Sequence, residues 1–350
     1  MMKIVFTGDI AIPSVSDIPK FCFPKELEQA YWFGNLEGAI VEDGDIKDLK
    51  LSSKQVIFNS KEAIEKLISD INFKGFLLAN NHIFDVPNSI NQTDKVLKSH
   101  NIPFTGLDDF NDEITKGLWI KEKNENLLIL NYGWQHIGCK KASKNTNGTN
   151  QLRRSQIVKD LNHYSVDEDL IIIIIFHLNY EFEPVLQPAH RQLCRELIDL
   201  GANSIICHHP HVVGPIEVYN KSIIAHTLGN FMFPHKVFWN GNHKYPDKCN
   251  RQKIIVFEDI SDLTRISTYN LYYSPELNKI KIINKEKILL GTPNTIGKMN
   301  YLEYLKYFLA KCTKRIYLPI VISNNPFIGS LYWYYLIVLH RAVLFTKKFK

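Results

Sequence analysis

The run from residue 170 to residue 176, LIIIIIF, restricts the fold of this chain more than any other stretch of its sequence. Consecutive β-branched residues with no polar position between them predict a strand that is buried on both faces. A strand of this kind lies in the middle of a sheet that is covered by helices. The run therefore predicts an α/β protein built in layers.

Apolar strands, each followed by polar residues and then by a helix, recur from residue 3 to residue 212. Residues 60–71 are predicted to be a helix because Ile64, Leu67, Ile68 and Ile71 have helical spacing and Ser60 can cap its N-terminus. Further helices are expected at residues 88–100 and 189–202. Residues 254–257, 266–272 and 280–283 are expected to form antiparallel strands.

Polar residues with metal-binding side chains stand directly after five of the predicted strands: Asp9, Glu37, Asn81 with His82, His177, and His209 with His211. In layered α/β sheets the crevice outside the carboxyl ends of the strands holds ligands. We therefore expect these side chains at one edge. An oxygen and nitrogen set without thiolates favours one or two ions of Mn, Fe or Zn over calcium or a structural zinc.

These clusters can also be interpreted as ordinary structural features with no role in function. The histidines around Pro210 could be surface residues in a loop, and Gly8-Asp9 is also a common turn. Asn35 and Glu37 point the same way in an extended segment, as they would at a polar hairpin end. Asn81-His82 with Asp85 three residues on is more specific, since Asp85 could orient the imidazole of His82.

The charge of the chain is unevenly distributed along its 350 residues. Residues 296–350 hold nine Lys and Arg against one acid, a net +8, so a total of +6 leaves residues 1–295 at about −2. The six cysteines form no C-x-x-C pair, and the chain opens into an apolar strand without a signal-peptide pattern. A cytoplasmic location with free thiols is therefore expected.

The polar clusters, in this order, resemble the CapA family, which is named for capsule and poly-γ-glutamate synthesis and is related to calcineurin-like metallophosphoesterases. The resemblance covers about residues 3–260 and rests on Gly8-Asp9, Asn35-Leu36-Glu37-Gly38, Ala79-Asn80-Asn81-His82 with Asp85, His177 with Glu181, His208-His209-Pro210-His211-Val212, and Leu228-Gly229-Asn230-Phe231.

The resemblance implies a four-layer α/β/β/α sandwich with a metal centre at the sheet edge. Its metal ligands would be Asp9, Glu37, Asn81, His177, His209 and His211. His82, supported by Asp85, would be the catalytic acid. Asn35, Asn80, Glu181 and His208 are expected to contact the substrate. The chain departs from the family pattern at Ala11, where a histidine is expected, and at Leu178-Asn179, where tryptophan and glycine are more common.

Residues 296–350 are expected to form a basic, aromatic tail outside a domain of residues 1–295. Residues 316–339 lack charge but are interrupted by Pro319, Pro326 and Gly329, so an interfacial or docking segment is favoured over a straight membrane span. The aromatic residues and flanking basic groups suit the headgroup region, at the inner face of the membrane. The alternative is packing on the core or on a second subunit.

Two classes of function fit these observations. One is a metal-dependent hydrolase or transferase, phosphoesterase-like or acting on an amide, in the synthesis, processing or attachment of a capsular or other anionic surface polymer. The other is a non-catalytic accessory or binding component of a capsule synthesis or export complex. The expected substrate is an anionic polymer or a phosphate-containing compound, and no nucleic-acid partner is expected.

Overall fold

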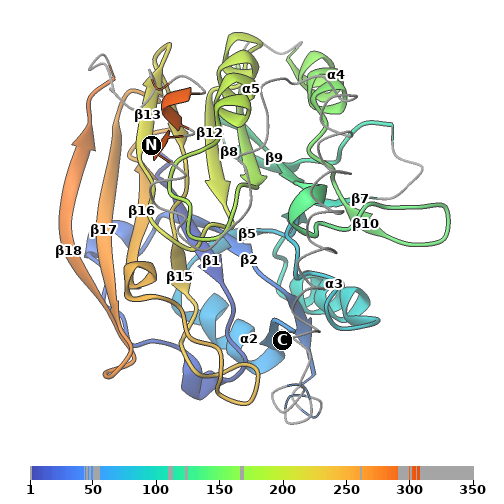
Figure 1. Ribbon diagram of the computed structural model, residues 1–350, viewed down its shortest axis with the longest axis vertical. Helices are drawn as coiled ribbons and strands as arrows, with labels where there is room; N and C mark the ends of the chain where they lie inside the picture. Colours follow the sequence, from blue (N-terminus) through green and yellow to red (C-terminus); the bar gives the residue numbers. More distant parts are fainter. Residues whose placement is uncertain are drawn as a thin grey trace.

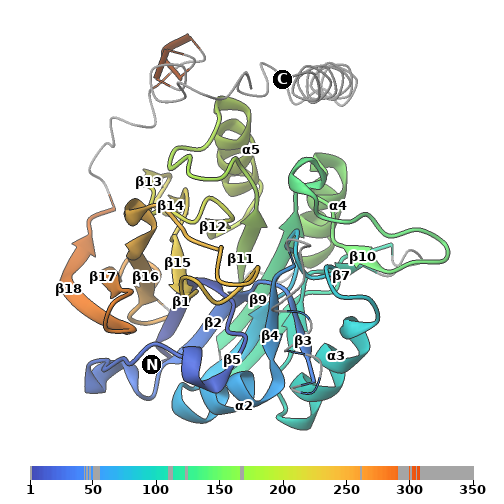
Figure 2. The ribbon, with the colours of Figure 1, turned by 60° about the horizontal axis from the view of Figure 1, so that its bottom comes forward.

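The fold is described from a computed structural model of the chain (Figures 1 and 2). The structure describes residues 2–42, 56–108, 113–122, 125–165, 169–260 and 262–290, together with residues 44, 46, 49, 299, 302–304 and 306–307. Among these residues, no helix has both the length and the apolar character needed to cross a membrane.

The first large sheet begins with the N-terminal strand and has the order β18-β17-β16-β1-β2-β5-β6, with β15 paired to β1. Strands β1, β2, β5 and β6 run parallel, whereas β16, β17 and β18 are antiparallel, as the sequence predicts. The strands of this sheet are β1 (Ile4–Ile10), β2 (Tyr31–Leu36), β5 (Phe73–Leu77), β6 (Phe104–Thr105), β15 (Asn230–Met232), β16 (Arg251–Phe257), β17 (Ile266–Ser274) and β18 (Lys279–Ile288).

The second large sheet has the isoleucine-rich strand β11 near its middle, in the order β13-β14-β12-β11-β9-β8. Strand β11 pairs in parallel with both β9 and β12, so it is a central strand. The strands of this sheet are β8 (Leu118–Glu122), β9 (Glu125–Gly133), β11 (Leu170–His177), β12 (Ser204–His208), β13 (Ile216–Tyr219) and β14 (Ser222–Ala225).

Four α-helices with described bounds and two small strand pairs add to these sheets, and residues 46, 49, 302–304 and 306–307 are also helical. The helices are α2 (Lys61–Asp70), α3 (Ser89–Ser99), α4 (Arg154–Tyr164) and α5 (Pro188–Asp199). The short pairs are β3 (Ala39–Val41) with β4 (Phe58–Ser60), and β7 (Leu107–Asp108) with β10 (Gly148–Thr149). Short 3-10 helices span Val15–Asp17, Lys25–Leu27, Gln135–Ile137 and Asp247–Asn250.

The two large sheets pack face to face, and helices cover their outer faces (Figure 2). One buried cluster lies between the sheets and joins Phe6 and Phe33 of the first to Ile173 and Ile175 of the second. A second cluster packs α2 and α3 on the outer face of the first sheet, and a third packs α4 and α5 on the second. The predicted four-layer α/β/β/α sandwich is confirmed.

The isoleucine run of β11 serves two cores because alternate residues of a strand point to opposite faces. Ile173 and Ile175 pack between the sheets, whereas Ile172 and Ile174 pack beneath α4 and α5. All four side chains are almost completely buried. This explains why the run carries no polar residue until His177, where the strand reaches the sheet edge.

Substitutions in β11 should therefore be severe on both faces. Ile173→Ala and Ile174→Ala should each lower the free energy of unfolding by about 2–5 kcal/mol, because each leaves a cavity in a closed core. Ile171→Ala, at a half-buried position, is the control and should lower it by less. Urea denaturation measures all three. An equally large loss for Ile171→Ala would contradict the two-core assignment.

Several predicted elements are confirmed, and others need correction. Ser60 caps α2 by accepting a hydrogen bond from the Ala63 backbone N–H. Gly8-Asp9 is not a turn after the first strand, because β1 continues through both residues to Ile10. The sequence patterns also missed α4 and β8. The predicted tail lies mostly outside the described residues, which include only Met299, residues 302–304 and residues 306–307 beyond residue 296.

Candidate metal centre

The predicted site residues do meet at one edge of the sandwich, where strands of both large sheets end. Asp9 lies near the end of β1, Glu37 directly follows β2, and His177 and His208 are the last residues of β11 and β12. Loops after β5 and β12 add Asn80 to Asp85 and His209 to His211. Strands of both sheets therefore deliver side chains to a single site, as the polar strand ends indicate.

Two glycines allow the backbone segments to pack closely enough to form this edge. A Cβ atom on Gly8 would lie 2.0 Å from the carbonyl oxygen of Gly229, and the Asp9 backbone N–H donates to the same oxygen. Gly38 has a φ of +80°, and a Cβ there would lie 2.4 Å from the carbonyl oxygen of Ile57. Both positions thus require glycine, and each stands next to a carboxylate of the site.

Asp9, Glu37 and His211 form the core of the site. Their metal-binding atoms lie within 4.8 Å of one another, and all three residues are buried. His211 Nδ1 is 3.3 Å from Asp9 Oδ2, and His211 Nε2 is 3.7 Å from Glu37 Oε1. Two carboxylates around one imidazole form a donor set that suits a divalent transition metal.

Glu37 is the most unusual of these groups because its buried carboxylate lacks hydrogen bonds. Neither of its two oxygens has a hydrogen-bond partner, although its side chain is fully buried. Burial, together with the negative charge of Asp9, raises the pKa of Glu37 to about 8. An ionised carboxylate in this position therefore needs positive charge close by. Among the described side chains, His211 and His82 supply part of that charge.

Asp9 and His211 stabilise each other's charged forms. Burial alone raises the pKa of Asp9, but hydrogen bonds to His208 and His211 outweigh it and hold the pKa well below its usual range. Burial alone lowers the pKa of His211, yet the charge of Glu37 and the hydrogen bond to Asp9 raise it to about 9. The site therefore already favours cations beside its carboxylates.

Asn81, His177 and His209 lie beside this core. His177 Nε2 is 2.8 Å from Asn81 Oδ1, and the rings of His177 and His209 meet edge to face with centroids 5.0 Å apart. Burial lowers the pKa of both histidines well below the usual value. Nδ1 of His209 is buried and has no hydrogen-bond partner. Neutral imidazoles with an unused nitrogen are the form that binds metals.

The turn that carries His209 and His211 has an unfavourable backbone. His209 and His211 have φ values of 98° and 57°, in the left-handed region that L residues rarely adopt. Pro210 between them restricts the alternatives. Strain of this kind persists where the surrounding structure imposes it, and it is concentrated at functional sites.

His82 and Asp85 form the pair that the sequence predicts. His82 Nδ1 is 2.6 Å from Asp85 Oδ2, while Nε2 is 3.8 Å from Glu37 Oε1. Burial alone lowers the pKa of His82, but the hydrogen bond to Asp85 and the charge of Glu37 raise it above the usual value. His82 is half-buried and thus remains accessible, unlike the histidines beside it.

The expected substrate-contacting residues fall into two groups. Asn35, Asn80 and His208 are buried. The Asn35 amide donates to Asp9 Oδ1 at 2.8 Å, Asn80 donates to Asn35 and to the Leu36 carbonyl, and His208 Nδ1 is 3.2 Å from Asp9 Oδ1. These contacts position Asp9 and its neighbours. Glu181 is exposed, and its charge raises the pKa of Glu37 and His211.

The sequence patterns missed two residues that touch His211. Asn230 Oδ1 is 2.8 Å from His211 Nδ1, and the ring of Tyr245 lies 4.7 Å from the imidazole. Asn230 belongs to the Leu228-Gly229-Asn230-Phe231 motif and could have been chosen from it. Tyr245 lies in a loop with no motif, so only the tertiary structure reveals it.

The residues present fit a bound metal ion. The Glu37 oxygens and His209 Nδ1 are buried polar atoms without hydrogen-bond partners, and leaving such atoms unsatisfied is unfavourable. Carboxylate, amide and imidazole groups from Asp9, Glu37, Asn81, His177, His209 and His211 form the expected oxygen and nitrogen set. The identity of the metal and the assignment of each ligand stay predictions.

Glu37→Gln should stabilise the metal-free protein while abolishing its stabilisation by metal. The substitution removes a buried carboxylate without partners, and Tm should rise about 2–4 °C for each kcal/mol gained. The gain should be larger at pH 8 than at pH 5. The folded protein keeps a proton on Glu37 that the unfolded chain loses above its ordinary pKa of 4.5, so wild-type stability falls across that window.

Thermal unfolding in chelator and in manganese measures both effects. Glu28→Gln, at an exposed position, is the matched control and should leave both Tm values unchanged. A Glu37→Gln protein that is less stable than wild type in chelator, or equally stabilised by manganese, would contradict the assignment of Glu37.

Comparison with known proteins supports the resemblance seen in the sequence. A family model described as "Bacterial capsule synthesis protein PGA_cap" matches residues 23–235. The chain is 28% identical over 206 residues to the PGA biosynthesis protein CapA of Bacillus subtilis (strain 168), covering 58% of this chain and 53% of that protein. It is 24% identical over 208 residues to the capsule biosynthesis protein CapA of Bacillus anthracis, covering 58% and 50%. The chain thus spans about half the length of these relatives.

Among solved structures, a phosphatase from Mycoplasma pneumoniae matches 86% of this chain and 98% of its own, with a TM-score of 0.43 and 11% identity. At this level of similarity the four-layer architecture rests on the chain's own sheets and helices.

Proposed function

The chain belongs to the family of bacterial capsule synthesis proteins, and from this premise we propose that it is a metal-dependent hydrolase or transferase acting on an anionic surface polymer. The observation that carries the proposal is the buried Glu37 carboxylate, which lies beside Asp9 and His211 without a hydrogen-bond partner on either oxygen. Selection for stability alone does not favour such a group, whereas a bound metal ion would supply the positive charge that the carboxylate lacks.

A metal ion held here by Asp9, Glu37, Asn81, His177, His209 and His211 would polarise a phosphoryl or carbonyl oxygen of the substrate. The protein residues around it have separate tasks. Asn35 and His208 hold the Asp9 carboxylate in place. Burial keeps His177 and His209 neutral, and therefore able to bind metal, at physiological pH.

His82 is proposed as the general acid that protonates the leaving oxygen or nitrogen. Asp85 binds Nδ1 and thereby directs Nε2 toward the carboxylate side of the site. The raised pKa of His82 favours its protonated form near neutral pH, as an acid requires. His82 is partly exposed and can therefore contact a substrate, whereas the other histidines of the site are buried.

His82→Ala should lower kcat by about 10²- to 10⁴-fold, the range expected for loss of a general acid, while metal content stays near wild type. His209→Ala should lose both metal and activity. Elemental analysis and turnover of a panel of phosphate esters and γ-glutamyl amides measure the two properties. If His82→Ala also loses metal, His82 belongs among the ligands instead.

The substrate is proposed to be poly-γ-glutamate or another anionic polymer of the cell surface. The printed names of the two relatives refer to PGA and capsule biosynthesis, which supports this class. A reaction at an ester, phosphoester or amide bond in the synthesis, processing or attachment of the polymer fits the same site, because a metal ion there would polarise a carbonyl or phosphoryl oxygen.

One observation favours the alternative, a non-catalytic component of a capsule synthesis complex. Ala11 is fully buried where the metallophosphoesterase pattern has a histidine, so a ligand of that pattern is missing. A single ion bound for structure or recognition fits this departure. Metal-loaded protein that binds the polymer but shows no turnover in the panel above would favour the accessory role.

Residues 296–350 are proposed to bind anionic membrane, at the inner face. Their net charge of +8 supplies the attraction, at about 1 kcal/mol per basic residue near the surface. The full chain should sediment with liposomes containing anionic lipid, and a chain ending at Thr295 should not. Equal sedimentation of the two proteins would leave packing on the protein or a second subunit as the role of this segment.

A further inference from the structure

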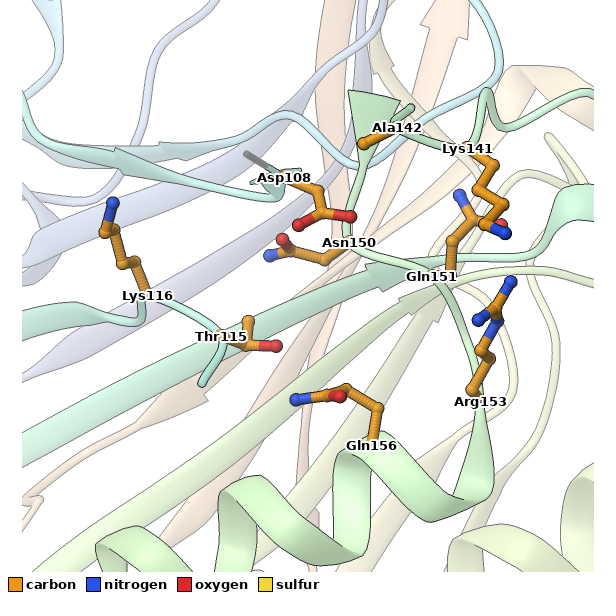
Figure 3. Close-up of a pocket in the computed structure, with 9 residues that line it drawn as sticks. All are labelled: Asp108, Thr115, Lys116, Lys141, Ala142, Asn150, Gln151, Arg153 and Gln156. Atoms are coloured by element: carbon orange, nitrogen blue, oxygen red, sulfur yellow. The ribbon is translucent and has the colours of Figure 1, made fainter. Parts of the chain in front are cut away.

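A second polar pocket lies beside β7 and β10, apart from the proposed metal ligands (Figure 3). Its volume is about 210 Å³. This is smaller than the roughly 300–1,000 Å³ of pockets that enclose whole drug-sized ligands. Ala142 is the single apolar side chain among the lining residues. A pocket of this size and polarity suits one small polar group.

The charges around the pocket are predominantly positive. Lys116, Lys141 and Arg153 line it, with Asp108 as the one acidic lining residue. Figure 3 shows Lys141 and Arg153 on one side of the pocket and Lys116 on the other. The buried Asp160 carboxylate nearby accepts hydrogen bonds from the neutral groups of Thr115, Tyr132 and Gln156.

Lys141 and Arg153 have no acidic partner in the described part of the chain. Neither side chain takes part in a hydrogen bond or ion pair there, whereas the adjacent Lys140 lies over the ring of Phe84. Both side chains are exposed, and an anion bound between them would be attracted to both positive charges. Amide groups of Asn150 and Gln151 in the lining can add hydrogen bonds.

The pocket is connected to the edge that carries the metal centre. The Gly133 backbone N–H donates to the Asn150 carbonyl at 2.8 Å, and Gly133 is paired with His177 between β9 and β11. The side-chain amide of Asn150 donates to the backbone carbonyl of Asn131. The side-chain oxygen of Asn131 in turn accepts a hydrogen bond from the Ala79 backbone N–H. Ala79 leads directly into Asn80 and Asn81.

We propose that this pocket is a binding site for an anionic group, a carboxylate or a phosphate, held between Lys141 and Arg153 with Lys116 opposite. Insofar as the proposed function holds, the group is a further acidic unit of the same polymer. Binding to the pocket itself requires neither a bound metal nor turnover.

Calorimetric titration of the full chain, stripped of metal and at low ionic strength, tests the proposal. Inorganic phosphate and glutarate, a dicarboxylate, are titrated separately. Wild type should bind at least one of them near 1:1. The double variant Lys141→Gln/Arg153→Gln should bind at least about tenfold more weakly, since two charge-assisted contacts are lost. Phosphate alone, glutarate alone or both would each identify the chemistry that the pocket accepts.

Three control variants test whether the anion is held in this pocket and not elsewhere on the protein. Lys144→Gln changes an exposed lysine of the same loop that does not line the pocket, so affinity should be unchanged. Lys141→Arg/Arg153→Lys keeps both charges and should retain most of the binding. His209→Ala should bind the anion as wild type does, because this pocket is not the metal centre. All variants alter side chains outside the core except His209→Ala, whose folding is checked by circular dichroism.

No saturable binding of either anion to wild type would overturn the proposal, as would equal affinities of wild type and the double variant. Loss of binding in His209→Ala with native circular dichroism would also overturn it, because the anion would then occupy the metal centre. None of these results bears on metal content or on the role of His82, so failure here is distinguishable from failure of the proposed function.

Discussion

A carboxylate removed from water without hydrogen bonds is the constraint around which this edge of the protein is arranged. Ionised Glu37 is unfavourable in its buried position unless positive charge lies close by. His211 and His82 are its near neighbours, and their positive charges favour the ionised form of Glu37. The negative charge of Glu37 in turn raises the pKa of both histidines. The site thereby holds a carboxyl group whose ionised form is only partly compensated by the positive charges of the described side chains.

The backbone around Glu37 follows from this arrangement. Gly8 and Gly38 let strands approach closely on either side of the carboxylates, and His209 and His211 adopt left-handed backbone conformations to direct their rings inward. The side-chain amide of Asn35 donates a hydrogen bond to the carboxylate of Asp9, and that of Asn80 donates to the backbone carbonyl of Leu36. The left-handed conformations of His209 and His211 lower stability, and the two closed cores on either side of β11 offset the loss.

The sequence predicts the elements of this fold where periodicity is strong and composition is extreme. The isoleucine run identifies β11 as a central strand, and Ser60 marks the start of α2, because both signals are local. It predicts that Asp9 and Glu37 converge because parallel strands present their carboxyl ends at one edge, whereas His177 reaches them from the second sheet through the packing of the two sheets. Helix α4 was missed since its apolar residues are few. Tyr245 and the unsatisfied state of Glu37 depend on packing between distant segments, which no local pattern reports.

The candidate metal centre is assembled from segments that are far apart in the chain. The backbone N–H of His209 lies 3.4 Å from Asp9 Oδ2, across a sequence separation of 200 residues. The chain loses conformational entropy when such distant segments come together, and this loss comes before the contact can stabilise the fold. Folds dominated by distant pairings therefore form slowly. These side chains come together only when the strands that carry them, in both sheets, have packed against each other. During synthesis, the nascent chain therefore cannot bring Asp9 and His211 together until residue 211 has left the ribosome.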